Sequence, residues 1–251
     1  MSRRRSLVAA LALVLAPATA SAQIIQAPLV NSAPRHTFGG ALIYGQPLGD
    51  FRQNVKRGLG LDGAGTFGID SRGIFSLRGE IGYQQYSSKS EYFVVNTGFG
   101  LAELESETKS TVMTAGIGPQ LSGPVGAAFR PYIAATVGVA RFATETSINL
   151  PAENSNTGQK QTLDKQTVSS DWLLSLGGAG GITFALPMFA RSGVMIDLGV
   201  RYHRNGLATY VSSEGVQYSG TGVATVTPTE SEADFLVYRV GIVMPIGGGR
   251  R

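Results

Sequence analysis

The sequence predicts an all-β fold, an eight-stranded antiparallel up-and-down transmembrane β-barrel over residues 37–246. Apolar residues alternate with small or polar residues along runs of about ten to fifteen residues, the period of strands with one apolar face. The connections between these runs alternate between short and long. Glycine is abundant at 34 of 251 residues, and only 15% are charged, against about 25% in soluble domains.

The first 22 residues are predicted to be a signal peptide. Three arginines at positions 3–5 precede an uninterrupted apolar run over residues 7–16, which is shorter than the roughly 20 residues of a membrane helix. Ala20-Ser21-Ala22 forms a small-residue cleavage site. We expect cleavage between Ala22 and Gln23, with residues 23–36 as a periplasmic lead into the barrel.

Net charge and composition exclude several classes of function. The chain carries a formal charge of +4, but removal of the three leading arginines leaves 18 basic against 17 acidic residues. No basic stripe remains for nucleic-acid binding. The absence of cysteine excludes disulfides, thiolate metal sites and cysteine nucleophiles, and two histidines offer little for a metal site.

The alternating runs place the eight strands along the chain. In the seventh, Leu198 and Val200 fall on one face, and Asp197 and Arg201 on the other. The fifth has apolar or small residues on both faces, so its facing stays open. The expected strands are 37–46, 57–70, 74–86, 110–121, 130–143, 169–185, 193–205 and 233–246.

The connections carry a second signal. Three are short (71–73, 122–129 and 186–192), and three are long and polar (87–109, 144–168 and 206–232). The first connection, 47–56, is intermediate. An even number of strands, with short turns at one end and long loops at the other, is the pattern of outer-membrane barrels.

Aromatic residues near the strand ends favour a membrane setting over a soluble barrel. The expected strands also exceed the average of about 5–6 residues in globular proteins. We expect two interfacial girdles where lipid meets water. The aromatics towards the long connections are Tyr44, Tyr83, Tyr86, Phe142, Trp172 and Tyr202, and those towards the short turns are Phe67, Phe75, Tyr132 and Phe184.

Residues 79–86 (GEIGYQQY), 130–142 (RPYIAATVGVARF) and 238–246 (YRVGIVMPI) resemble strands of the small eight-stranded outer-membrane barrels, the opacity-protein-like and OmpA-type family. The resemblance implies a monomer in the bacterial outer membrane. Its partners would be the surrounding outer-membrane lipid and the barrel assembly machinery that inserts it. Members commonly end on an aromatic residue. Here a tail of glycine and arginine occupies residues 247–251.

If the apolar face meets lipid, a balanced set of charges points into the lumen. Buried charges are tolerated when they pair, and a barrel of eight strands is narrow enough to be filled by side chains. We therefore expect a paired network that plugs the lumen. Its members are Asp62, Arg78, Glu80, Asp197, Arg201 and Arg239, with His203 nearby.

No enzymatic site or cofactor is expected. His203-Arg204-Asn205-Gly206 is similar to the His-x-Ser-Asn stretch of lipid A deacylases, but arginine stands where the nucleophilic serine would be. The sequence favours a structural or surface-interaction scaffold that displays its long loops. One alternative is a narrow pore for small solutes or ions. Another is a secreted soluble β-barrel with its apolar face inside, around an apolar ligand.

Overall fold

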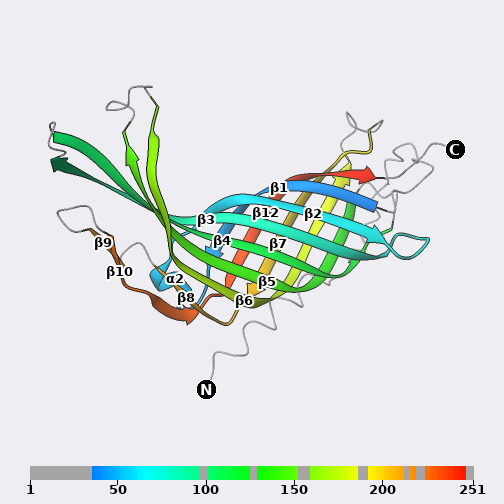
Figure 1. The fold of residues 1–251 in the computed structure, drawn as a ribbon. Coiled ribbons are helices and arrows are strands. Elements are labelled where there is room, and N and C mark those ends of the chain that lie inside the picture. Colours follow the sequence, from blue (N-terminus) through cyan, green and yellow to red (C-terminus); the bar gives the residue numbers. More distant parts are fainter. Residues whose placement is uncertain are drawn as a thin grey trace, which may run out of the picture.

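Eight antiparallel strands close into a barrel in the computed structural model (Figure 1), as the sequence predicts. Their order around the barrel is β1-β12-β7-β6-β5-β4-β3-β2. The strands are β1 (His36–Pro47), β2 (Gly58–Gly68), β3 (Phe75–Asn96), β4 (Leu101–Ser122), β5 (Phe129–Leu150), β6 (Gln161–Ala185), β7 (Met195–Arg204) and β12 (Phe235–Ile246).

The structure describes residues 36–96, 101–124, 129–151, 159–185, 192–211, 215–218 and 224–246. The expected signal peptide 1–22 with its Ala22–Gln23 cleavage site lies outside the described residues. So do residues 23–35 of the expected lead and the tail 247–251.

Pairing of the first strand with the last closes the barrel. Leu42 of β1 faces Val240 of β12 on one side and Leu61 of β2 on the other. All backbone groups along such a cylinder find partners in neighbouring strands, so no open sheet edge remains where the strands meet. Gly199 shows how tightly the lumen is filled, because a Cβ there would lie 2.5 Å from the Tyr132 hydroxyl oxygen.

Four strands continue well beyond the barrel, which corrects two of the predicted loops. β3 leaves β2 near Gln85 but stays paired with β4 as far as Asn96 and Leu101. β5 and β6 stay paired as far as Leu150 and Gln161. The two hairpin arms extend from one end of the barrel, stay paired with each other as far as Glu105 and Asn149, and diverge at their tips (Figure 1). Segments 87–109 and 144–168, predicted as loops, are therefore largely paired strands.

The two other connections at this end also contain ordered structure. A one-turn helix, α2 (Phe51–Asn54), lies between β1 and β2. Four short strands lie between β7 and β12, in two antiparallel pairs. They are β8 (Leu207–Tyr210), β9 (Val216–Tyr218), β10 (Ala224–Val226) and β11 (Thr229–Glu232). Among the described residues, no helix is long and apolar enough to cross a membrane.

Candidate functional site

The barrel carries its large apolar side chains outside and its charges inside. Leu42 is 69% exposed on the exterior, whereas the neighbouring lumen residue Asp62 is 5% exposed. The apolar interior expected for the alternative of a soluble barrel is therefore wrong for this charged part of the lumen. The exposed apolar surface includes Phe38, Leu42, Leu59, Leu61, Ile81, Ile117, Ile133, Val137, Leu174, Leu198, Val240 and Ile242.

Most of the aromatics expected at interfaces are at least partly exposed. Tyr44 lies beside Tyr238 with ring centroids 6.2 Å apart, and Phe184 lies 6.1 Å from Phe129. Tyr44 and Phe184 are partly buried. The more exposed members are Phe67, Phe75, Tyr83, Trp172 and Tyr202, between 38% and 63% exposed.

Three of the predicted interfacial aromatics are inside the barrel instead. Tyr132 and Phe142 are 6% and 1% exposed, because even-numbered residues of β5 point inward. This strand has small or apolar residues on both faces, so its alternation gives no direction. Tyr86, also expected at the interface, is buried in the same way from β3.

Six of the seven predicted lumen residues form one continuous chain of ion pairs. Their side chains are at most 4% exposed. They come from β2, β3, β7 and β12, which brings residues distant in sequence together across the lumen. The pairs are Arg78–Glu80 at 2.8 Å, Glu80–Arg201 at 2.9 Å, Arg201–Asp62 at 2.9 Å, Asp62–Arg239 at 2.7 Å and Arg239–Asp197 at 2.5 Å.

Neutral side chains complete this network. The Tyr132 hydroxyl donates to Asp197 Oδ1 at 3.0 Å, and Arg78 Nη1 donates to the side-chain oxygen of Gln120 at 2.9 Å. The Thr136 hydroxyl donates to Glu80 at 3.2 Å. Such pairing and hydrogen bonding is what makes buried charge tolerable.

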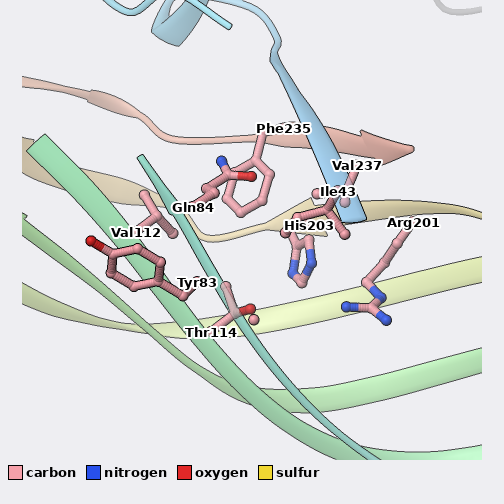
Figure 2. A pocket seen from close by; sticks show the side chains of 10 residues that line it. Ile43, Tyr83, Gln84, Val112, Thr114, Arg201, His203, Phe235 and Val237 are labelled. Carbon is pink, nitrogen blue, oxygen red and sulfur yellow. The ribbon is translucent and has the colours of Figure 1, made fainter. Parts of the chain in front are cut away.

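His203, the seventh predicted residue, lies beside this chain and forms no ion pair among the described residues. Its Nδ1 is 3.3 Å from the Ser175 hydroxyl, and its ring stacks on Phe235 at 4.7 Å. With Arg201 it lines a small cavity (Figure 2). A serine beside a histidine is part of a nucleophilic dyad. Here both are almost fully buried, and no described carboxylate bonds to the ring.

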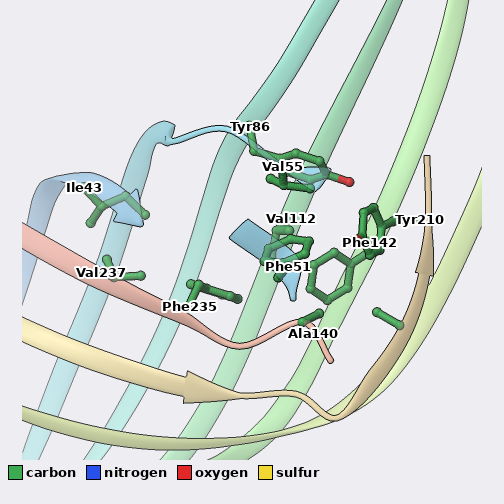
Figure 3. Close-up of a cluster of buried hydrophobic side chains, with 12 residues drawn as sticks. Ile43, Phe51, Val55, Tyr86, Val112, Ala140, Phe142, Tyr210, Phe235 and Val237 are labelled. Carbon is green, nitrogen blue, oxygen red and sulfur yellow. The ribbon is translucent and has the colours of Figure 1, made fainter. Parts of the chain in front are cut away.

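An apolar cluster closes the lumen on the side of the arms, and the sequence did not reveal it. Phe51 of α2 is 1% exposed and makes edge-on contacts with Tyr86, Phe142 and Tyr210, at centroid distances of 6.0, 5.8 and 5.0 Å. Val112 packs in the same cluster (Figure 3). We call α2 together with β8 the lid. In the sequence, the lid is marked only by Phe51 and Tyr210, each within a polar connection.

Hydrogen bonds around Asp234 fasten the lid. The Leu48 amide donates to the Asp234 carbonyl at 2.9 Å, next to α2. The Asp234 carboxylate accepts from the Tyr202 hydroxyl at 2.5 Å and from the backbone amide of Asn205 at 3.2 Å. The Thr209 amide in β8 donates to Asp171 at 2.8 Å. Both halves of the lid are thus attached to the barrel rim.

The arms carry an ion-pair cluster of their own. Lys160 Nζ lies 2.7 Å from Glu105 and 3.1 Å from Glu107, which also pairs with Lys109 at 2.9 Å. The hydrogen bond to Glu105 raises the pKa of Lys160 above its usual value. Partial burial would raise the pKa of Glu107, but hydrogen bonds from Lys109 and Lys160 outweigh it and lower that pKa. No group of three or more acidic or histidine residues suited to a metal ion occurs in the described part of the chain.

Comparison with known proteins finds similarity among solved structures. No family model matches the sequence, and no curated protein matches it. Neisserial surface protein A (NspA) is 13% identical with a TM-score of 0.45, covering 86% of this chain and 99% of that one. Ail, the attachment invasion locus protein of Yersinia pestis, is 10% identical with a TM-score of 0.41, covering 83% and 96%.

The outer membrane protein OprG from Pseudomonas aeruginosa is 13% identical with a TM-score of 0.43, covering 85% of this chain and 96% of that one. At these identities the likeness is one of fold alone. The eight-stranded barrel assignment itself rests on the closed sheet of this chain.

Proposed function

We propose that this protein is an integral outer-membrane β-barrel that acts as a structural and surface-interaction scaffold with a mostly plugged lumen. The observation that carries the proposal is the inverted distribution of side chains. Leucines such as Leu42 and Leu59 are about 70% exposed, while Asp62, Arg201 and Arg239 are at most 5% exposed. An exterior of this kind is stable in hydrocarbon and a liability in water.

The closed sheet supports the same location. Hydrocarbon offers no partner for free backbone groups, so only helices and closed barrels span membranes. Partly exposed aromatics such as Trp172 and Tyr202 suit the headgroup level. We call the exposed apolar surface of the eight barrel strands, which includes Leu42, Leu198 and Val240, the belt. Because each of these strands is paired on both sides, no sheet edge is left in the belt for a second copy, which favours a monomer. Insertion by the barrel assembly machinery and export through the predicted signal peptide are parts of this proposal.

Two layers in series support a plugged lumen. The lid packs an apolar layer around Phe51 at the end with the arms. The chain of ion pairs forms a second layer below it. A solute crossing the lumen would have to displace both the aromatic cluster and the paired charges, so we expect no steady conductance.

The arms support the surface-interaction role. They extend β-structure beyond the barrel on the side of the long connections. Arm residues Tyr92, Val94 and Leu101 are 56–77% exposed. Contact surfaces held on a rigid frame are where binding commonly occurs. In this account the barrel is the anchor and the arms are the working surface.

Cell fractionation, followed by a detergent gel with and without boiling, tests the location. We expect the protein in the outer-membrane fraction, with Gln23 as its first residue and with different mobility before and after boiling. Recovery as a soluble protein without detergent would overturn the proposal. Deletion of both arms should abolish surface-binding phenotypes but leave insertion intact; unchanged binding would refute the role of the arms.

Planar-bilayer recording separates the plugged scaffold from the narrow pore. The plugged lumen predicts no steady current from the wild-type protein. A large and steady conductance would support the pore and contradict the plug. The recording uses protein whose gel mobility shows it to be folded, so that leakage from misfolded material is not counted.

A further inference from the structure

A polar cavity lies in the lumen between the ion-pair network and the short-turn end of the barrel. All eight barrel strands contribute to its wall. Three guanidinium groups line it, those of Arg78, Arg130 and Arg239, against the single carboxylate of Asp197. The wall is therefore rich in positive charge, while the lid lies at the opposite end of the lumen.

The one carboxylate in the wall is already engaged. Asp197 Oδ1 accepts from the Tyr132 hydroxyl at 3.0 Å, and Oδ2 accepts from Arg239 Nη1 at 2.5 Å. The side-chain oxygen of Gln120 accepts from Arg78, and its nitrogen donates to Ser122 at 2.9 Å. The acceptors of this wall are thus largely satisfied by the wall itself.

Unsatisfied donors remain. Arg78 is 3% exposed, and its Nη2 has no hydrogen-bond partner among the described residues. The buried Nε of Arg239 likewise has none there. A buried guanidinium nitrogen without an acceptor costs free energy, which an anion would recover if it came within hydrogen-bonding distance of Arg78 Nη2.

The formal charges of the side chains around the cavity also favour an anion. The ion-pair network contains three arginines and three acids and is neutral. Arg130 adds a positive charge with no ion pair among the described residues, since it donates to the carbonyl oxygens of Gly123 and Gly73. The nearby Asp70 lies on the exposed turn and accepts from the amides of Ile74 and Phe75.

We propose that this cavity binds one small inorganic oxyanion of the phosphate or sulfate class. Arg130 supplies a positive charge without a close ion pair, and Arg78 Nη2 supplies a buried donor. The ligand enters from the short-turn end, because the ion-pair network and the lid close the other side. The site depends on the lumen geometry alone and stands apart from the proposed membrane location and surface role.

Titration of the folded full-length protein in zwitterionic micelles with inorganic phosphate, followed by calorimetry or ³¹P NMR, tests the site. We expect saturable binding at a single site. Arg130→Gln should weaken it at least about tenfold, the loss typical for one charged hydrogen-bonding partner. Arg72→Gln removes the same charge from the exposed turn at the same end, and should leave affinity within about twofold.

A second variant guards against a folding failure of Arg130→Gln. Thr183→Glu places a carboxylate on the cavity wall, where it should occupy the site from within and abolish phosphate binding. Gel mobility shows whether each variant is folded. Absence of saturable binding to the wild-type protein would overturn the proposal. So would equal weakening by Arg72→Gln, or displacement of phosphate by an equal concentration of chloride.

Discussion

Single residues at the centre of the lumen hold the interior together. Asp62 accepts from both Arg201 and Arg239, at 2.9 and 2.7 Å, with a side chain that is fully buried. Asp62→Ala leaves two buried guanidinium groups short of a partner. We expect it to lower the free energy of unfolding by about 3–5 kcal/mol, measured by urea titration in micelles.

Glu145→Ala is the matched control, because it breaks the exposed pair with Lys165 on an arm. Its expected cost is about 0–1 kcal/mol. Similar small losses for both variants would show that the lumen pairs contribute nothing beyond a surface ion pair.

A single residue can also report on the exterior. Leu42 and Leu101 are 69% and 77% exposed, one on the barrel belt and the other on an arm. In a bilayer, Leu42→Arg should destabilise the folded protein by about 2–4 kcal/mol, because it places a charge in hydrocarbon. Leu101→Arg should change stability by less than about 0.5 kcal/mol. Equal effects in lipid vesicles would contradict a lipid-facing belt.

At the scale of elements, the packing of the lid depends mainly on the side chain of Phe51. Phe51→Ala removes the ring that contacts Tyr86, Phe142 and Tyr210, and should weaken lid packing by about 3–5 kcal/mol. We expect trypsin to cut quickly at the basic residues of segment 52–57. Phe38→Ala, on the exposed belt, should leave this segment resistant. Unchanged protection in Phe51→Ala would mean that the aromatic cluster does not hold the lid.

The arms should respond to pH. Glu107 has a lowered pKa in the folded protein, so its ion pairs stabilise the arms fully above its usual value of 4.5. That contribution is lost as the pH falls below this value, through the folded pKa. The protection factors for hydrogen exchange of the backbone amides in residues 101–109, which compare the observed with the intrinsic rate, should therefore fall in acid. Lys160→Gln should reduce this dependence, and Lys165→Gln should preserve it.

The sequence predicts the strands within the barrel but not the strands of the arms, and the reason is physical. Within the barrel, lipid on one side and a crowded lumen on the other impose strict alternation, so the β7 and β12 faces were readable. The arms have solvent around them, and segments such as 101–109 carry enough glutamate, serine and lysine to read as loop. Pairing with a neighbouring strand holds them as β-structure, and pairing is not visible in the local sequence.

The interior was only partly predictable from the sequence. Charges that lipid would not accept had to point inward, which placed Asp62 and Arg239 on the lumen side. Phe51 gave no such signal, since one phenylalanine in a polar connection fits an exposed position equally well. Tyr132 and Phe142 were placed outside because β5 lacks a polar face to contrast with its apolar one.

At the scale of the whole molecule, the central claim is that the apolar exterior faces lipid while the arms face water. The chain has no cysteine, so one introduced thiol can carry a fluorophore at a chosen place. Val240 and Val94 are a matched pair, 58% and 56% exposed, one on the belt and one on an arm.

Val240→Cys and Val94→Cys, each labelled and reconstituted in vesicles, can be compared with a lipid-attached quencher and a water-soluble quencher. We predict that the lipid-attached quencher reaches the label at position 240 and the water-soluble one reaches the label at position 94. Strong quenching of both labels by the water-soluble reagent alone would contradict a membrane-embedded belt.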